Sequence, residues 1–262
     1  MLLTRLAHYF AQRPTASTSS STASSTLRTP AAGSGWSEVF LDEEAAARLP
    51  ASKSIEMGHS ILLLPGLATR QECEELRIEA SCVAAACSST VTFLTVQDKI
   101  GAVGTGLVDS LLKRAISRVH SRLPELLPSL FGDCLEEPSC LHNRRLNFSE
   151  DEPWIIVYGA GGEFLPHVDG QALTVLMPLS DERDGAFAGG GTAFWSQQDL
   201  QGPGSLQPPT RILSPTAGTA VVFGGNVTHA GHPVSCGERS VLVASFSPHP
   251  QKARMYGAVQ GG

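Results

Sequence analysis

Two histidines and an aspartate have the residue types and the spacing of a metal site. His167 and Asp169 stand two residues apart in the motif His-Val-Asp, and alternate residues of a β-strand point to the same face. His229 follows about sixty residues later, in the segment Asn-Val-Thr-His-Ala-Gly-His. Two imidazoles and one carboxylate form a facial triad, which leaves three open positions and suits non-haem Fe(II). The spacing therefore predicts that these three side chains bind one ferrous ion.

An arginine ten residues after His229 strengthens this interpretation. A His-x-Asp motif alone also fits a histidine that is hydrogen-bonded to a carboxylate on a strand. Arg239, on a following strand, presents a planar guanidinium that can bind a carboxylate through two parallel hydrogen bonds. A co-substrate that chelates the metal at one end needs such a partner at its other end. The alternative role for Arg239 is a surface salt bridge.

Short apolar runs after Trp154 predict the strands that position these residues. The runs are 154–158, 173–179, 192–195, 220–223 and 240–246, and clusters of Gly, Pro, Asn and Asp separate them. Many short strands with such turns are typical of a β-sandwich or barrel-like fold. The segments 184–191 and 201–209 are too rich in Gly and Pro for helices, and we expect loops there.

The preceding part of the chain predicts supporting elements. Residues 61–64 form an apolar run that ends at Pro65-Gly66, which is typical of a short buried strand. Thr69 and Glu72 have the spacing of a capping box, so a helix should run from there to about residue 86. A second helix is expected over 107–123, where apolar residues recur on one face. We expect both helices to pack against a sheet.

The first 37 residues differ in composition from the rest. They contain no Asp or Glu, three arginines and fourteen Ser or Thr, and they open with an amphipathic stretch. This profile is typical of an organelle transit peptide, and the alternative is a disordered tail. We therefore divide the chain into 1–37, a supporting segment 38–150, a metal-binding core 151–250 and a C-terminal tail 251–262. A mitochondrion or plastid is the expected location, with the cytoplasm as the alternative.

Composition excludes several other classes of protein. The formal net charge is −6, whereas a nucleic-acid-binding protein normally carries a basic face. No apolar run approaches the roughly 20 residues that a membrane-spanning helix needs. The chain has only six cysteines, too few for a disulfide scaffold of this length. The expected partner is a peptide or small-molecule substrate, and the sequence does not indicate an oligomeric state.

Three motifs together resemble a known family. HVD, GGGTAFW and HAGHPVSCGERSVLVASF are similar to motifs of the Fe(II)- and 2-oxoglutarate-dependent dioxygenases, in particular the prolyl 4-hydroxylase-like branch. The resemblance covers roughly residues 55–248 and is densest over 154–246. It implies a mainly β fold with flanking helices, a double-stranded β-helix or jelly roll. It also implies that Fe(II) binds at the triad and that Arg239 holds the distal carboxylate of 2-oxoglutarate.

The resemblance also assigns a role to Tyr158, and two departures suggest one for Thr174. Tyr158, nine residues before His167, matches a tyrosine that lines the co-substrate pocket in relatives. Relatives often carry a polar residue at the position of Val241, and some carry a tyrosine near Pro178. Co-substrate binding would therefore use another partner here, and Thr174 is the candidate.

The reaction implied by the resemblance is hydroxylation of an unactivated C–H bond. It would consume 2-oxoglutarate and O₂, and ascorbate would keep the iron ferrous. Asp169 favours hydroxylation over halogenation, since a Gly or Ala there would leave a place for chloride. The substrate would be a prolyl or another peptidyl side chain. The alternatives are a cupin-like metal-binding protein without 2-oxoglutarate chemistry, which would not need Arg239, and a catalytically silent scaffold.

Overall fold

The structure is a computed structural model that describes residues 27–28, 35–135, 139–197 and 207–249. Most of segment 1–37, the C-terminal tail 251–262 and most of the expected loop 201–209 lie outside these residues. The transit peptide and the organelle location therefore stay predictions. No helix among the described residues combines the length and the apolar character that a membrane crossing requires.

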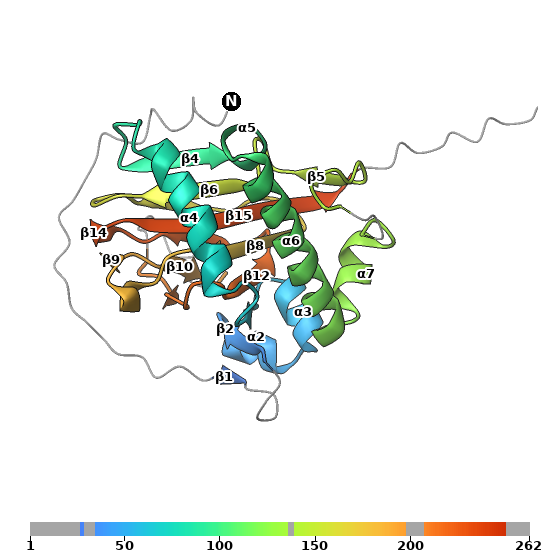
Figure 1. Cartoon of the computed structure of the whole chain (residues 1–262). Coiled ribbons are helices and arrows are strands. Elements are labelled where there is room, and N and C mark those ends of the chain that lie inside the picture. The colour runs from blue at the N-terminus through green and yellow to red at the C-terminus, as the bar shows by residue number, and fades with distance from the viewer. Residues whose placement is uncertain (1–26, 29–34, 136–138, 198–206, 250–262) are drawn as a thin grey trace, which may run out of the picture.

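The larger of two facing sheets forms the centre of the fold (Figure 1). It contains nine strands, and every strand pair in it is antiparallel. Eight strands follow one another across the sheet, and β5 (Leu146–Phe148) pairs with the far end of β15. Their order is β1 (Leu27–Arg28), β2 (Ser37–Phe40), β3 (Ser60–Leu64), β12 (Ala220–Gly224), β8 (Leu173–Pro178), β15 (Arg239–Pro248), β6 (Trp154–Tyr158) and β4 (Val91–Thr95).

The smaller sheet packs against one face of the larger sheet. Buried side chains from both sheets, such as Phe194, Phe223 and Val241, form one hydrophobic cluster. This stacking of antiparallel sheets is the predicted jelly roll. The small sheet has the order β11 (Arg211–Leu213), β10 (Thr192–Trp195), β13 (Thr228–Gly231) and β7 (Phe164–His167), beside a two-stranded ribbon of β14 (Val234–Gly237) and β9 (Phe187–Gly189).

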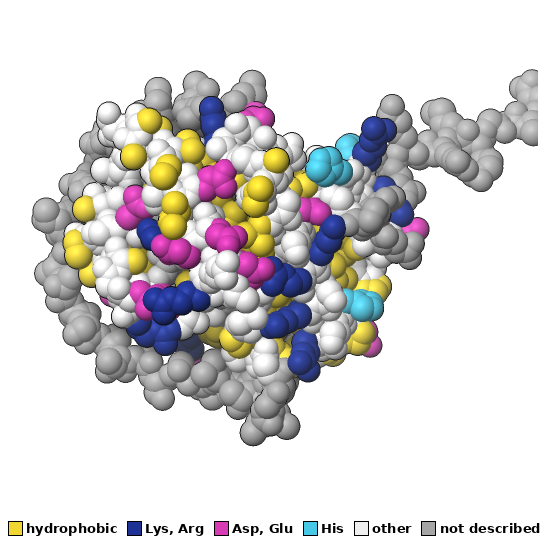
Figure 2. Space-filling view, in the orientation of Figure 1, with side chains coloured by type: hydrophobic (Ala, Val, Ile, Leu, Met, Phe, Trp, Pro, Cys, Tyr) yellow, Lys and Arg dark blue, Asp and Glu magenta, His cyan; other side chains and the backbone are white. Residues whose placement is uncertain are grey.

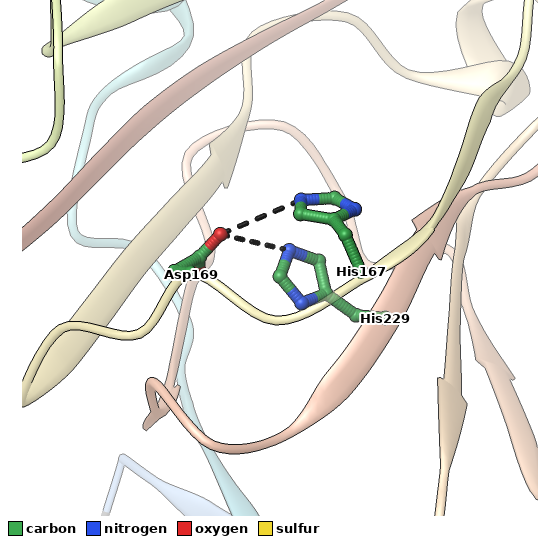
Figure 3. A group of neighbouring side chains, drawn as sticks. All are labelled: His167, Asp169 and His229. Carbon is green, nitrogen blue, oxygen red and sulfur yellow. Dashed lines mark ion pairs between the residues drawn. The ribbon is translucent and has the colours of Figure 1, made fainter. Parts of the chain in front are cut away.

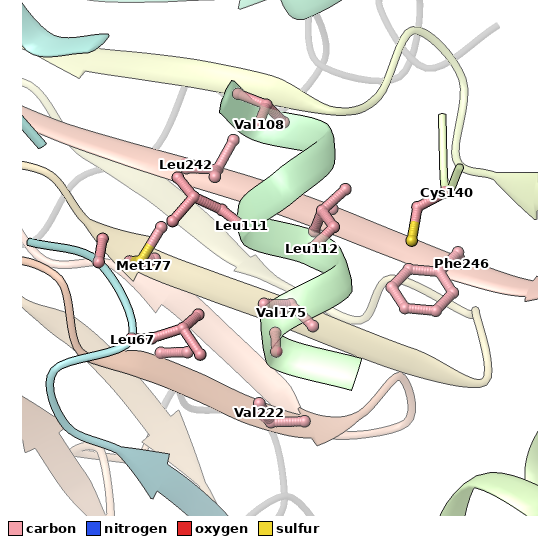
Figure 4. Packing of buried hydrophobic residues seen from close by; sticks show 14 of the residues in the cluster. Leu67, Val108, Leu111, Leu112, Cys140, Val175, Met177, Val222, Leu242 and Phe246 are labelled. Atoms are coloured by element: carbon pink, nitrogen blue, oxygen red, sulfur yellow. The ribbon is translucent and has the colours of Figure 1, made fainter. Parts of the chain in front are cut away.

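Helices cover the other face of the larger sheet. The two long ones are α4 (Arg70–Ala84) and α6 (Ala102–Arg122), which cross the strands in Figure 1. Figure 4 shows Leu111 and Leu112 of α6 next to Val175 and Leu242 of the sheet, within the largest buried cluster. Shorter helices are α2 (Glu43–Ala47), α3 (Ala51–Glu56), α5 (Val96–Lys99) and α7 (Leu126–Phe131), with a 3₁₀ turn η1 (Glu182–Asp184).

The capping box predicted at the start of α4 is confirmed. The Thr69 hydroxyl accepts the backbone N–H of Glu72, and the Glu72 carboxylate accepts the backbone N–H of Thr69 at 2.8 Å. Both bonds satisfy donors that the first turn of a helix leaves free. The outer surface of these helices carries interspersed acidic and basic side chains (Figure 2), including the pairs Arg77–Glu74 and Arg114–Glu72. Such mixing is typical of a solvated face.

Two expectations about the elements need correction. The helix expected over 107–123 begins earlier, at Ala102. Its first turn contains glycine, and the apolar face from which the helix was predicted does not extend into this turn. The segment 184–191 is not entirely a loop, since β9 lies within it and pairs with β14. The division into a supporting segment 38–150 and a core 151–250 stays a prediction, and β2, β3 and β4 of the supporting segment extend the larger sheet on both sides.

Candidate active site

Two strands of the small sheet place the two histidines of the motif side by side. β7 and β13 are antiparallel neighbours, and His167 stands opposite His229 in their register. The centroids of the two imidazole rings are 4.3 Å apart. Phe194 and Phe223 pack against the His229 ring, which is 4% exposed. Strand pairing thus brings together two side chains that are far apart in the sequence.

Asp169 also lies beside the two histidines, but a different feature of the backbone from the one expected orients its side chain. β7 ends at His167, so strand alternation does not orient Asp169. The chain turns instead at Gly170, which has a φ of 69° and donates its backbone N–H to the carbonyl of Gly225. Asp169 Oδ1 then lies 3.4 Å from His167 Nε2 and 3.7 Å from His229 Nε2 (Figure 3).

The donor set fits a divalent metal ion. One candidate ligand atom from each residue lies within 4.8 Å of the other two. His167 Nδ1 lies 2.8 Å from the carbonyl oxygen of Leu165, and His229 Nδ1 lies 3.1 Å from that of Val227. A proton on each Nδ1 donates to these carbonyls, which leaves both Nε2 lone pairs free for a metal. Two nitrogens and a carboxylate oxygen are suitable ligands for Fe(II).

The surroundings favour the protonation states that a metal requires. Burial lowers the pKa of His229 to about 4, so its imidazole is neutral at pH 7. Burial alone would raise the pKa of Asp169, but the hydrogen bond with His167, the electrostatic interaction with His229 and the hydroxyl of Thr174 lower it overall. A neutral imidazole and an ionised carboxylate are the metal-binding forms of these groups.

Arg239 is a buried cation on the larger sheet. It is the first residue of β15 and stands opposite Tyr158 of β6 in the strand register. Only 3% of Arg239 is exposed. Its guanidinium carbon lies 5.4 Å from the centroid of the Tyr158 ring, and Nη2 donates to the Thr192 hydroxyl at 3.1 Å. Burial lowers the pKa of Arg239.

No acidic side chain in the described part of the chain forms an ion pair with Arg239. A buried cation that has only a hydroxyl and an aromatic ring as partners is costly for a folded protein. Such a cation indicates the binding of an anionic ligand that the chain itself does not contain.

One cavity joins the histidine–aspartate cluster to Arg239. Its volume is about 320 Å³, and His167, Asp169, His229, Tyr158 and Arg239 all lie on its wall. Ile156, Leu176, Val241 and Val243 of the larger sheet supply apolar surface between the polar groups. The structure therefore brings together five of the six residues that the sequence singled out.

Thr174 is the exception. It is fully buried on β8, is not among the residues that line the cavity, and its hydroxyl donates to Asp169 Oδ2. The hydroxyl that was expected to contact the co-substrate is thus held by the carboxylate. This contact favours a role for Thr174 in positioning Asp169.

Replacing Thr174 with valine tests this positioning role. Because valine keeps the shape but lacks the donor, we expect metal affinity to fall about 10- to 100-fold, the usual effect of losing a group that orients a ligand. Calorimetric titration with Mn(II) would measure this loss. At saturating metal, the affinity for 2-oxoglutarate should stay within about twofold of wild type. A loss of 2-oxoglutarate affinity alone would instead support direct contact with the co-substrate.

Glu152 also lines the cavity, and the sequence reasoning missed it. It precedes β6, and its carboxylate accepts hydrogen bonds from the backbone N–H and the hydroxyl of Ser245. Burial raises the pKa of Glu152 to about 7 despite these bonds, and the nearby charge of Asp169 adds to the effect. No motif marks this position, since it becomes part of the cavity only when β15 packs beside β6.

The raised pKa of Glu152 predicts a pH-dependent stability in metal-free protein. The folded state holds this proton up to a pH of about 7, whereas the unfolded chain releases it near the ordinary glutamate pKa of 4.5. Stability from this group is therefore complete below pH 4.5 and is lost as the pH rises to about 7. The side chain of Glu152→Gln cannot titrate, so the variant does not lose this stability as the pH rises. Its free energy of unfolding, relative to that of wild type, should therefore increase by up to about 3 kcal/mol between pH 4.5 and 8. Urea unfolding at both pH values measures this change, and an unchanged difference would contradict the prediction.

Comparison with known proteins matches a segment that contributes most of the residues lining this cavity. Residues 153–246 match the family model of the 2OG-Fe(II) oxygenase superfamily. The matched segment runs from β6 into β15 and contains the three candidate metal ligands and Arg239. Over this segment, the match agrees with the superfamily that the motifs indicated. Among curated proteins, the comparison found no match.

Solved structures of low sequence identity are also similar to the chain. A viral collagen prolyl hydroxylase from Paramecium Bursaria Chlorella virus-1 is 16% identical, over 72% of this chain and 96% of that one, with a TM-score of 0.47. The α-ketoglutarate-dependent epimerase SnoN from nogalamycin biosynthesis is 18% identical, over 79% and 84%, with a TM-score of 0.50. A prolyl-4-hydroxylase from Pseudomonas putida is 14% identical, over 76% and 97%, with a TM-score of 0.48.

Proposed function

We propose that this chain, whose residues 153–246 belong to the 2OG-Fe(II) oxygenase superfamily, hydroxylates an unactivated C–H bond of a peptidyl side chain. His167, Asp169 and His229 would hold the ferrous ion, and Arg239 would hold 2-oxoglutarate. One observation carries the proposal: a metal-binding triad and a buried cation without an acidic partner face the same cavity.

Bound Fe(II) would supply the activation of O₂ that couples substrate hydroxylation to the conversion of 2-oxoglutarate into succinate and CO₂. The chain itself contributes binding, orientation and exclusion of water. The carbonyls of Leu165 and Val227 fix the orientation of the two imidazoles through Nδ1. The hydroxyl of Thr174 holds the second oxygen of Asp169. These contacts preorganise the ligands before a metal arrives.

Arg239 and Tyr158 support binding of the co-substrate. The Arg239 guanidinium can donate two hydrogen bonds to a carboxylate, and in this buried position water competes little for them. Tyr158 lies beneath the guanidinium and restricts its position. Gly231 packs so closely on the Tyr158 side chain that a Cβ there would lie 2.9 Å from one ring carbon and from the hydroxyl oxygen. Val241, which replaces a polar residue of relatives, adds apolar surface beside this site.

A peptidyl substrate, prolyl or otherwise, is favoured by an aromatic surface that extends from the cavity to the outside. Trp154 and Phe164 line the cavity, and Phe93 contacts both rings, at centroid distances of 5.2 and 5.3 Å. Phe93 is 39% exposed on β4, at the edge of the larger sheet. Exposed aromatic side chains beside a sheet edge suit the docking of an extended peptide.

Ascorbate is proposed as the reductant of the iron, on the resemblance alone.

Two measurements test the proposed function. Calorimetry should show that protein loaded with Mn(II) binds 2-oxoglutarate, and Fe(II)-loaded protein should form succinate in the presence of O₂. Metal binding without 2-oxoglutarate binding would favour the cupin-like alternative instead. A protein that binds neither Fe(II) nor Mn(II) would support a silent scaffold and overturn the proposal.

A further inference from the structure

We propose that Glu152 recognises a cationic amine of the substrate, so that the enzyme selects a side chain with an apolar stem and an amine at its end. The inference rests on the proposed function and specifies its substrate class. It is carried by the position of the carboxylate, by the charges around the cavity and by the apolar and aromatic lining.

The geometry leaves one oxygen of Glu152 available to a ligand. β15 pairs with β6 as far as Val243, which stands opposite Trp154, and Ser245 lies beyond this paired stretch. Glu152 Oε2 accepts the backbone N–H and the hydroxyl of Ser245 there, the latter at 2.8 Å. No hydrogen bond within the described residues engages Oε1, and Glu152 lies on the cavity wall. One oxygen therefore supports the sheet, and the other is free.

The two hydrogen bonds that Glu152 accepts from Ser245 do not require a charged side chain. A glutamine side chain could accept the same two hydrogen bonds through its amide oxygen. An ionised carboxylate in a half-buried position such as that of Glu152 is instead costly unless a cation pairs with it, and partial burial raises the pKa of Glu152. A perturbed carboxylate in a cavity is typical of a functional group. A bound ammonium would compensate this cost.

The charges around the cavity also favour a cationic substrate. When Fe(II) and 2-oxoglutarate are bound, the positive charges of Fe(II) and Arg239 balance the negative charges of 2-oxoglutarate and Asp169. Arg239 is the only Lys or Arg among the described residues that line the cavity. Glu150 and Glu152 on the same wall then remain without a compensating cation. Their potential attracts a positive group.

The remaining lining suits the rest of such a substrate. Trp154 stands two residues from Glu152 on the wall, and an aromatic ring stabilises a nearby ammonium through a cation–π interaction. Val241 and Val243 provide apolar surface for an alkyl stem. A prolyl residue, by contrast, has neither a charge nor an N–H donor to offer Glu152.

Three blocked tripeptides that differ only in the central residue test the inference. The central residues are lysine, norleucine, which keeps the stem but lacks the amine, and proline. Calorimetry would use protein loaded with Mn(II) and 2-oxoglutarate, in which no turnover interferes. We expect the lysine peptide to bind about tenfold or more tightly than either of the others, as a charge-assisted hydrogen bond implies. In Glu152→Gln this preference should fall to about twofold or less.

Glu150→Gln is the matched control, because it removes the same charge from an exposed position of the same wall. It should retain most of the preference for lysine, since exposed charges contribute little. Equal binding of the lysine and norleucine peptides by wild type, or tighter binding of the proline peptide, would overturn the inference. An unchanged preference in Glu152→Gln would also overturn it. The binding of 2-oxoglutarate in the same samples tests the proposed function separately.

Discussion

Asp169→Ala is expected to abolish iron binding and succinate formation. Asp169 supplies the only carboxylate of the triad, and its Oδ1 lies within 3.7 Å of both Nε2 atoms. Loss of a group that merely orients a ligand costs about 10- to 100-fold in metal affinity, so loss of a ligand itself should cost more than about 100-fold. Anaerobic calorimetry with Fe(II) would measure the affinity, and a succinate assay would measure turnover.

Asp133→Ala is a suitable control for this variant. Asp133 is an exposed aspartate paired with Arg145 at the surface, outside the cavity. It should bind Fe(II) as wild type does, with a change in stability of at most about 1 kcal/mol. Metal affinity in Asp169→Ala that equals that of the control would show that the triad is not the iron site.

Arg239→Met is expected to raise the 2-oxoglutarate concentration needed for half-maximal turnover by about 100-fold. Losing a buried charge-assisted pair between an arginine and a carboxylate typically costs about 2–5 kcal/mol, and each 1.4 kcal/mol is a factor of ten. Metal affinity should stay close to wild type, because Arg239 contributes no ligand atom to the triad. Kinetics at varied 2-oxoglutarate, together with calorimetry, would separate the two effects.

The stability of ligand-free Arg239→Met provides an internal check. In the wild-type chain the guanidinium is buried with only Thr192 and Tyr158 as partners. Replacing an uncompensated buried charge with an apolar side chain of similar length is often neutral or stabilising. Thermal unfolding should therefore show no loss of stability. Unchanged turnover in both Arg239→Met and Asp169→Ala would reject the assignment of this cavity as the active site.

Local sequence patterns were sufficient to predict many elements. The capping box of Thr69 and Glu72 fixes the start of α4, because both of its hydrogen bonds join residues within one helical turn. The apolar runs at 154–158 and 192–195 have the same bounds as β6 and β10. Interactions between near neighbours in the chain determine these features, so a single sequence can reveal them.

The loop that contains Asp169 shows where local rules fail. Strand alternation predicts the correct partner for His167, but β7 ends at His167, two residues before Asp169, so alternation along a strand cannot be the reason. The turn at Gly170 and its hydrogen bond to Gly225 orient the carboxylate instead. Gly225 comes from the connection between β12 and β13, which no pattern around residue 169 reveals.

The sequence by itself determined the residue types of the metal triad, the arginine ten residues after its last member and the strand-rich character of the core. Tertiary structure alone decided that His167 faces His229, that Tyr158 lies under Arg239, that Thr174 holds Asp169 and that Glu152 enters the cavity. The physical reason is that the pairing of distant strands and the burial it produces set these contacts. Burial also shifts the pKa values of His229 and Glu152, and it depends on the packing of the whole chain.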